Sequence, residues 1–175
     1  MPLIIDCMKP LFTLAALVFA FSMSAQQYLT RQGTITFDAG SPLEDIRATS
    51  LSATAVYDKA TKKLGVQALM TSFEFKRALM QEHFNESYVE SERFPKTVFK
   101  GKYMDGRAVG TLTIHGVAQN VDVPATLVEE NNKVILRADF SVRIADFDVR
   151  IPKTVANKIE EKAKISLDCT LSLKP

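Results

Sequence analysis

The 175-residue sequence lacks the short signatures that mark several classes of protein. It contains no Gly-x-Ser-x-Gly segment of the kind found in hydrolases and no glycine-rich phosphate-binding loop. It has only two histidines, His83 and His115, and neither has the spacing to other ligand-type residues that zinc sites use. We therefore predict no catalytic residue, no metal site and no other cofactor, and we interpret both histidines as hydrogen-bonded structural residues.

An excess of charge of one sign is also absent. Lysine and arginine exceed aspartate and glutamate by only two, and the two signs are interspersed along the chain. We expect no nucleic-acid partner, because such partners select a concentrated basic patch. Seven glycines and seven prolines are too few for long linkers or low-complexity segments.

A long hydrophobic run is missing too. The most apolar stretch covers residues 11–21, about 11 residues against the roughly 20 that a membrane-spanning helix needs. Lys9 precedes this stretch and small residues follow it, which is the order of a secretory signal peptide. We predict a signal peptide over residues 1–25 and one exported domain over residues 26–175, located in the periplasm or secreted, with no transmembrane segment after cleavage.

Cysteine is nearly absent from the predicted exported domain. Cys7 lies in the predicted signal peptide and would be removed by cleavage. If translation starts at Met8 instead of Met1, Cys7 is not part of the protein at all. Cys169 is then the single cysteine, and an odd cysteine cannot form an internal disulfide. It falls among alternating apolar and polar residues, so we predict a buried thiol that packs as a small hydrophobic side chain.

What the sequence does have is alternation of apolar and polar residues with a period of two. This pattern is typical of half-buried strands, and short strands separated by polar turns favour an all-β sandwich or an up-and-down barrel. The eight predicted strands cover residues 33–40, 47–58, 64–75, 97–106, 108–116, 120–128, 134–142 and 164–173.

Three segments interrupt the strands. Residues 76–91 have the best helical pattern, which Pro95 ends. Residues 41–48 predict a turn or a short helix, and residues 153–162 have a helical composition. We expect one helical segment near residues 76–91.

Many positions on the predicted inward face are small. They are Ala53, Ala55, Ala68, Gly101, Gly110, Ala125 and Ala138. An eight-stranded barrel is just wide enough for its side chains to fill it, so small inward residues can leave room for one ligand. The same residues can instead face large partners across a solid core. The sequence leaves both interpretations open.

The segment VGTLTIHGVAQNVDVPATL contains a recognisable motif. Gly110, Leu112, Thr113, His115, Gly116 and Val117, followed by Val121 and Val123, resemble the G-x-L-T-x-H-G-V signature of the YceI-like family of exported lipid-binding proteins. FPKTVFKG and DFSVRIADFDVRIP resemble two further segments of that family. The resemblance extends over most of the chain, roughly residues 33–173.

The resemblance implies an eight-stranded antiparallel, lipocalin-like barrel that holds an isoprenoid chain in an apolar tunnel. Strand parity and the resemblance together suggest the ligand-binding residues Phe37, Val66, Met70, Phe84, Phe99, Tyr103, Leu112, Ile114, Phe140 and Phe147. Candidate ligands are an isoprenoid quinone, a polyprenol or another long-chain lipid. The sequence decides neither among these ligands nor between a monomer and a homodimer.

Two segments depart from the family pattern. An extended helical stretch, KRALMQEHFNESYVESERF, replaces a usual loop. Ala145 and Asp148 stand where the family usually has arginine and glycine. These departures concern the mouth of the barrel. In the family the matching segment lies at one end of the barrel, so the resemblance implies that Phe84, Tyr88 and Phe94 plug or line that end, with His83 partly buried among them. An alternative hypothesis is a ligand-free stress-response or protein-interaction module with a packed barrel, which would use the helical stretch as a recognition element.

Overall fold

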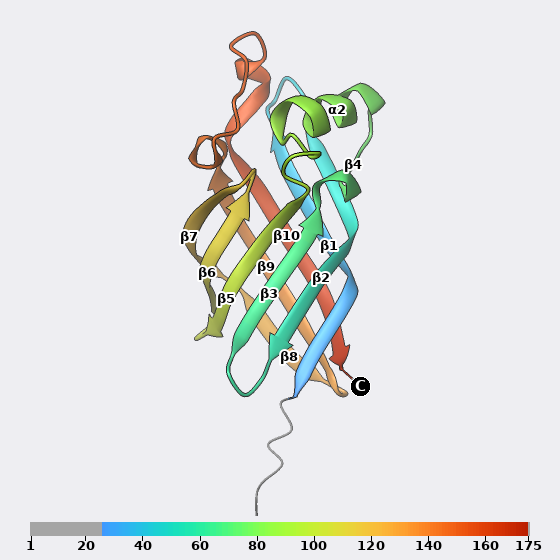
Figure 1. The fold of residues 1–175 in the computed structure, drawn as a ribbon, viewed down its shortest axis with the longest axis vertical. Coiled ribbons are helices and arrows are strands. Elements are labelled where there is room, and N and C mark those ends of the chain that lie inside the picture. The colour runs from blue at the N-terminus through green and yellow to red at the C-terminus, as the bar shows by residue number, and fades with distance from the viewer. Residues whose placement is uncertain (1–25, 175) are drawn as a thin grey trace, which may run out of the picture.

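The structure is a computed structural model that describes residues 26–174. The predicted signal peptide, residues 1–25, lies outside the described residues. One antiparallel sheet dominates the fold, with both ends of the described chain at one end of the sheet and α2 (Ala78–His83) at the other (Figure 1). We call the end with the termini the lower end and the end with α2 the upper end.

Ten strands form the sheet within the described residues. They are β1 (Gln27–Gly40), β2 (Arg47–Asp58), β3 (Lys63–Leu69), β4 (Glu74–Phe75), β5 (Lys96–Met104), β6 (Arg107–Ile114), β7 (Val117–Pro124), β8 (Thr126–Glu130), β9 (Lys133–Arg143) and β10 (Ile159–Leu173). Their order is β7-β6-β5-β3-β2-β1-β10-β9-β8, and the short β4 pairs with β2. Every pairing is antiparallel.

The ten strands correspond to the eight predicted ones because two predicted strands are each divided. The 3₁₀ turn η1 (Met70–Ser72) divides the predicted strand at 64–75 into β3 and β4. Pro124 ends β7 within the predicted strand at 120–128, and β8 follows. Proline lacks the N–H that a central ladder needs, so it lies where pairing changes partner.

The two end strands of the sheet are consecutive in the chain. β7 pairs with β6, β8 pairs with β9, and only Ala125 separates them. The Ala125 N–H donates to the Gly106 carbonyl at 2.9 Å, so the chain passes here from one edge of the curled sheet to the other. Within residues 26–174, no ladder of backbone hydrogen bonds joins β7 to β9. The sheet is therefore a strongly curled half-barrel. The predicted all-β, barrel-like fold class is confirmed.

Three hairpins close with two-residue turns in which both residues have positive φ. Their turn residues are Asp105–Gly106, His115–Gly116 and Asn131–Asn132. Such turns match the right-handed twist of the flanking strands and favour Gly, Asn and Asp. The turns predicted at residues 105–106 and 131–133 are therefore confirmed, and they set the register of β5, β6, β8 and β9.

The helical segment predicted near residues 76–91 is also confirmed. It consists of α2 followed by η2 (Phe84–Tyr88), a π-helical turn of the kind often found at functional sites. No described helix is long and apolar enough to cross a membrane.

The helical composition of residues 153–162 is misleading. Only η4 (Ala156–Lys158) is helical there, and β10 begins at Ile159. Ile159 pairs with Gly40 of β1, and Lys162 pairs with Arg143 of β9. Pairing on two sides outweighs local helix propensity, which is a weak preference.

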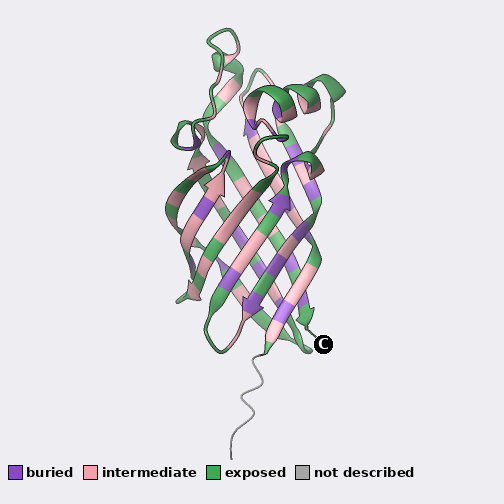
Figure 2. Ribbon diagram, in the orientation of Figure 1, coloured by how far each residue is buried: buried purple, intermediate pink, exposed green. Residues whose placement is uncertain are grey.

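The buried residues form two clusters. The lower cluster contains Tyr28, Ala55, Tyr57, Leu64, Ala108, Ala125, Val134, Leu136, Ala138, Cys169 and Leu171. The upper cluster contains Ile35, Ala48, Ala53, Ala68, Met70, Phe73, Phe84 and Val89. Buried residues alternate with more exposed ones along the strands, whereas α2 has no buried residue (Figure 2).

The prediction that Cys169 is a buried core thiol is confirmed. It is fully buried in the lower cluster, and burial raises the pKa of its thiol to about 12. Gly33 of β1 faces it closely, because a Cβ at that position would overlap the Cys169 Sγ. Here a glycine makes room for a neighbouring side chain.

Candidate functional site

A cavity of about 470 Å³ runs inside the curled sheet, within the size range of ligand pockets in proteins. Its lining reaches from lower-cluster residues such as Leu64 and Leu136 to Leu79 at the upper end. Leu79 on α2 is 64% exposed, so the lining extends to the surface at that end. The walls are almost entirely aliphatic and aromatic.

Nine of the ten sequence-predicted site residues line this cavity. They are Phe37, Val66, Met70, Phe84, Phe99, Leu112, Ile114, Phe140 and Phe147. Tyr103 does not line the cavity and packs against the lower cluster instead. Contact of these residues with a ligand stays a prediction, because a lining position shows only that the side chain faces the hollow.

The sequence selection missed other wall residues. Among them are Ile35, Phe73, Phe75, Val142, Ile165 and Leu167. Ile35 shares strand parity with Phe37, and Ile165 and Leu167 share the alternation of the last strand, so parity alone could have found these three. The loop residues Val149, Ile151 and Val155 also line the cavity, and no strand periodicity marks them.

An aromatic group surrounds Phe84 at the upper end. The Phe84 ring centroid lies 4.9 Å from that of Phe75, 5.9 Å from that of Phe37 and 6.2 Å from that of Phe73, all in tilted arrangements. Such pairs stabilise each other beyond the area they bury. Phe84 begins the π-helical turn, so the helical segment directs one large ring into the cavity while most of its own surface stays exposed.

The small inward residues divide between the two interpretations left open by the sequence. Ala68, Ala125 and Ala138 line the cavity. Ala53 and Ala55 are fully buried without lining it, so packed neighbours fill the space beside them. Small residues thus open part of the barrel interior and allow close packing in the rest.

Charged side chains line the cavity only at its upper end. Glu44 lies in the turn between β1 and β2, Arg77 precedes α2, and Lys158 ends η4. The Glu44 carboxylate forms an ion pair with the Arg77 guanidinium, and its other oxygen lies 3.7 Å from the Lys158 Nζ. Three segments far apart in sequence therefore meet at one carboxylate.

His115 ties the upper segments together. Its Nδ1 lies 3.2 Å from the Phe147 carbonyl oxygen and its Nε2 lies 3.3 Å from a Glu90 carboxylate oxygen. Phe94 packs edge-on against the ring, with centroids 4.6 Å apart. The hydrogen-bonded structural role predicted for His115 is therefore confirmed. Phe94 packs on this ring and does not line the cavity.

Two expectations for the upper end need correction or refinement. His83 is exposed where it lines the mouth of the cavity, and it is not partly buried among the aromatic rings. Asp148, at the family's usual glycine position, has φ of 54° and caps η3 (Ile144–Phe147) in the left-handed region, which aspartate tolerates better than most residues.

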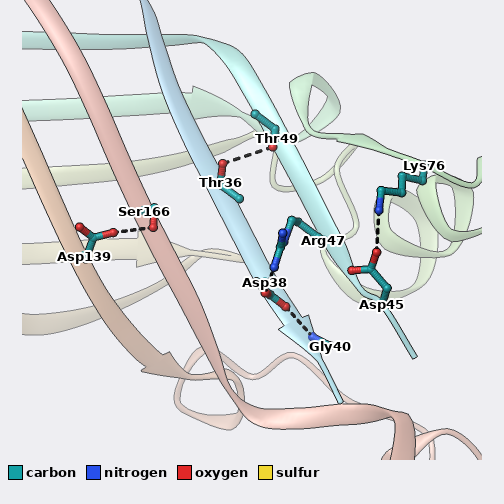
Figure 3. Close-up of polar contacts among 9 residues, drawn as sticks. All are labelled: Thr36, Asp38, Gly40, Asp45, Arg47, Thr49, Lys76, Asp139 and Ser166. Carbon is teal, nitrogen blue, oxygen red and sulfur yellow. Dashed lines mark hydrogen bonds and ion pairs between the residues drawn. The ribbon is translucent and has the colours of Figure 1, made fainter. Parts of the chain in front are cut away.

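The outer face of the sheet contrasts with the cavity because polar pairs cover it. Arg47 donates to Asp38 at 2.8 Å, and the hydroxyls of Thr36 and Thr49 lie 3.2 Å apart, both across β1 and β2 (Figure 3). Ser166 donates to Asp139 across β10 and β9. Among residues 26–174, no three His, Cys, Asp or Glu side chains form a group that could hold a metal ion. The arrangement as a whole is suited to enclosing an apolar molecule.

Comparisons with known proteins agree with this geometry. The model of the YceI-like domain matches residues 21–171. A polyisoprenoid binding domain from Saccharophagus degradans has a TM-score of 0.73 at 10% identity, and 86% of this chain and 100% of that chain are covered. BcnA of Burkholderia cenocepacia has a TM-score of 0.68 at 14% identity, covering 80% of this chain and 96% of that one.

A YceI protein of Campylobacter jejuni has a TM-score of 0.57 at 19% identity, covering 71% of this chain and 81% of that chain. No curated protein sequence matches at a significant level. At these identities the solved structures establish the fold alone, whereas the family model covers most of the chain. This chain therefore belongs to the YceI-like domain family.

Proposed function

We propose that the protein binds a long-chain amphiphilic lipid without covalent chemistry, and that it is not an enzyme. The observation that carries this proposal is the apolar cavity of about 470 Å³, whose charged lining residues lie only at the mouth. Moving one methylene group from water into such a cavity is favourable by about 0.8 kcal/mol. A chain of several isoprene units would therefore bind tightly with few polar contacts.

The class of lipid is inferred from shape and from relatives. An unbranched or isoprenoid chain fits an elongated cavity that runs between the two clusters. The neighbour from Saccharophagus degradans is described as a polyisoprenoid binding domain, which supports an isoprenoid quinone or a polyprenol as the ligand. Export to the periplasm or outside the cell is part of the proposal and rests on the signal-like pattern of residues 1–25.

The alternative, a ligand-free interaction module, requires a packed interior. The cavity and the small residues Ala68, Ala125 and Ala138 on its wall argue against it. No other observation favours that alternative.

Extraction of purified protein with organic solvent tests the proposal. Mass spectrometry of the extract should detect a lipid at a constant ratio to protein, and repeatedly lipid-free extracts would count against it.

A matched pair of variants makes the test sharper. Ala138→Phe fills the cavity from β9 and should abolish lipid co-purification, whereas Ala118→Phe adds the same ring at an exposed position of β7 and should not. Equal lipid content in folded samples of both variants would show that the lipid binds elsewhere.

A further inference from the structure

The mouth of the cavity carries more positive than negative charge. The charged residues that line the cavity are Glu44, Arg77 and Lys158, two cations and one anion. The rest of the lining is apolar apart from a few neutral polar side chains such as Gln67 and Thr97, and His83 at the rim. The electrostatic character of the cavity is therefore concentrated at the end where a ligand's headgroup would lie.

The two cations flank the same carboxylate. Arg77 Nη2 pairs with Glu44 Oε1, and Lys158 Nζ lies 3.7 Å from Glu44 Oε2. The Glu44 side chain is only 18% exposed, whereas those of Arg77 and Lys158 are 58% and 47% exposed. Glu44 is thus more buried than the two cations and holds them in place. The exposed parts of the Arg77 and Lys158 side chains face the mouth of the cavity.

Both cations retain donors that Glu44 does not use. A guanidinium has five N–H donors in a planar fork and an ammonium has three. In the described part of the chain, the ion-pair partner of each cation is Glu44. Glu44 engages one guanidinium nitrogen of Arg77, and it lies 3.7 Å from the ammonium nitrogen of Lys158. One carboxylate leaves one unit of positive charge uncompensated between them.

Neighbouring charges do not cancel this excess. Lys76, the residue next to Arg77, pairs with Asp45 at 2.8 Å, and Arg47 pairs with Asp38 (Figure 3). Neither pair lines the cavity. Asp38 and Asp45 are thus paired outside the mouth, and the uncompensated positive charge lies on the lining itself.

We propose that the ligand carries an anionic headgroup, a carboxylate or a phosphate, which binds between Arg77 and Lys158. This inference rests on the proposed lipid-binding function and narrows the ligand to an acidic long-chain lipid, in place of the neutral quinone or polyprenol. The headgroup accepts hydrogen bonds from the two cations, and the apolar chain extends past Phe84 toward the lower cluster. A planar guanidinium fork suits either acid, because both present paired oxygens.

Lipids with the same tail and different headgroups test this. Hexadecanoic acid, hexadecyl phosphate and the neutral hexadecanamide would each compete with a fluorescent lipid probe bound to delipidated protein. We expect the two acids to bind roughly fivefold more tightly than the amide at low salt, since the two cations are about half exposed. The preference should shrink as added salt screens the charges. Inorganic phosphate alone should not displace the probe, because it has no tail.

Variants of the mouth identify the groups responsible. The double variant Arg77→Met, Lys158→Met should bind acid and amide equally, with its affinity for the amide unchanged. Lys76→Met removes an adjacent cation that does not line the cavity and should keep the preference for acids. If the double variant fails to fold, the single variant Lys158→Met can be tested instead. This substitution is at a half-exposed position and should weaken the preference for acids.

The possible outcomes distinguish the anionic headgroup from the proposed lipid-binding function. Equal affinity of the native protein for acid and amide would overturn the anionic headgroup while leaving lipid binding intact, and would favour a neutral quinone or polyprenol. Failure of the fluorescent lipid probe and of all three hexadecyl compounds to bind would contradict the lipid-binding function itself. Displacement of the probe by inorganic phosphate alone would show an anion site independent of any lipid tail, and would also overturn the inference.

Discussion

The lower and upper ends of the half-barrel are built differently. At the lower end, regular strands joined by tight turns bring together fully buried residues such as Leu171 and Val134. At the upper end, η1, α2, η2, η3 and η4 interrupt the strands, and aromatic rings gather around Phe84. The cavity runs between these two regions.

This contrast separates stability from binding. Lower-cluster side chains that do not line the cavity, such as Leu171 and Val134, are fully buried, so truncating them leaves a void that the surroundings fill only in part. Side chains of the upper cluster face an existing hollow and contribute less to the packed core. Substitutions at the lower end should therefore change mainly the free energy of unfolding, and substitutions at the upper end mainly the affinity for a ligand.

The largest effect is expected from Leu171→Ala at the lower end. Leu171 is fully buried and does not line the cavity, so truncation should lower the free energy of unfolding by about 3 kcal/mol. Leu173, on the same strand and 47% exposed, is the matched control, and Leu173→Ala should cost about 0.5 kcal/mol or less. Urea denaturation measures both values, and equal values would mean that the lower end is not tightly packed.

Overpacking at the lower end should have the next largest effect. Gly33→Ala places a methyl group against Cys169 Sγ and should destabilise the protein by about 2 kcal/mol. Cys169→Ala in the same chain removes the sulfur and should recover part of that loss. Gly65→Ala is the control, because its Cβ would meet nothing closer than 3.9 Å. Absence of any recovery in the double variant would show that the strain arises elsewhere, for example at Ala53.

The lower end is also the part that the sequence predicts best. Apolar alternation places Leu136 and Leu171 inside correctly, and Asp105–Gly106 and Asn131 mark the hairpins that set the register. Local chemistry decides both features, so each can be derived from a few adjacent residues. The buried thiol of Cys169 follows from the same alternation.

The upper end is less predictable because contacts between distant segments form it. No local pattern indicates that Glu44 lies between Arg77 and Lys158, since the three residues are brought together only by the complete sheet. Residues 153–162 look helical until β1 and β9 pair with them. The parity rule finds wall residues on strands, and it has no counterpart for Val149 or Val155 in the loop.

A third prediction tests the upper end directly. Phe84→Ala removes the ring at the centre of the aromatic group, and we expect about a tenfold weaker affinity for a hexadecyl ligand, since apolar contact area is lost. Phe94→Ala is the control, because Phe94 packs on His115 outside the cavity. Competition with a fluorescent lipid probe measures both affinities. A large loss of stability without a change in affinity for Phe84→Ala would place that ring in the structural core instead.

The smallest effect concerns the outer surface near the upper end, where Arg47 donates to Asp38 (Figure 3). That hydrogen bond holds the pKa of Asp38 below its ordinary value, so folding gains stability when the carboxylate is ionised. This contribution is present above the unfolded pKa of roughly 3.9 and is lost as pH falls through the lower folded value. The difference in unfolding free energy between the native protein and Arg47→Met should therefore be small at neutral pH and vanish in acid.

Thr49→Val breaks the neighbouring neutral pair, and its effect should not vary with pH over that range. If both differences followed the same pH profile, a global acid transition of the sheet, not the titration of Asp38, would be responsible.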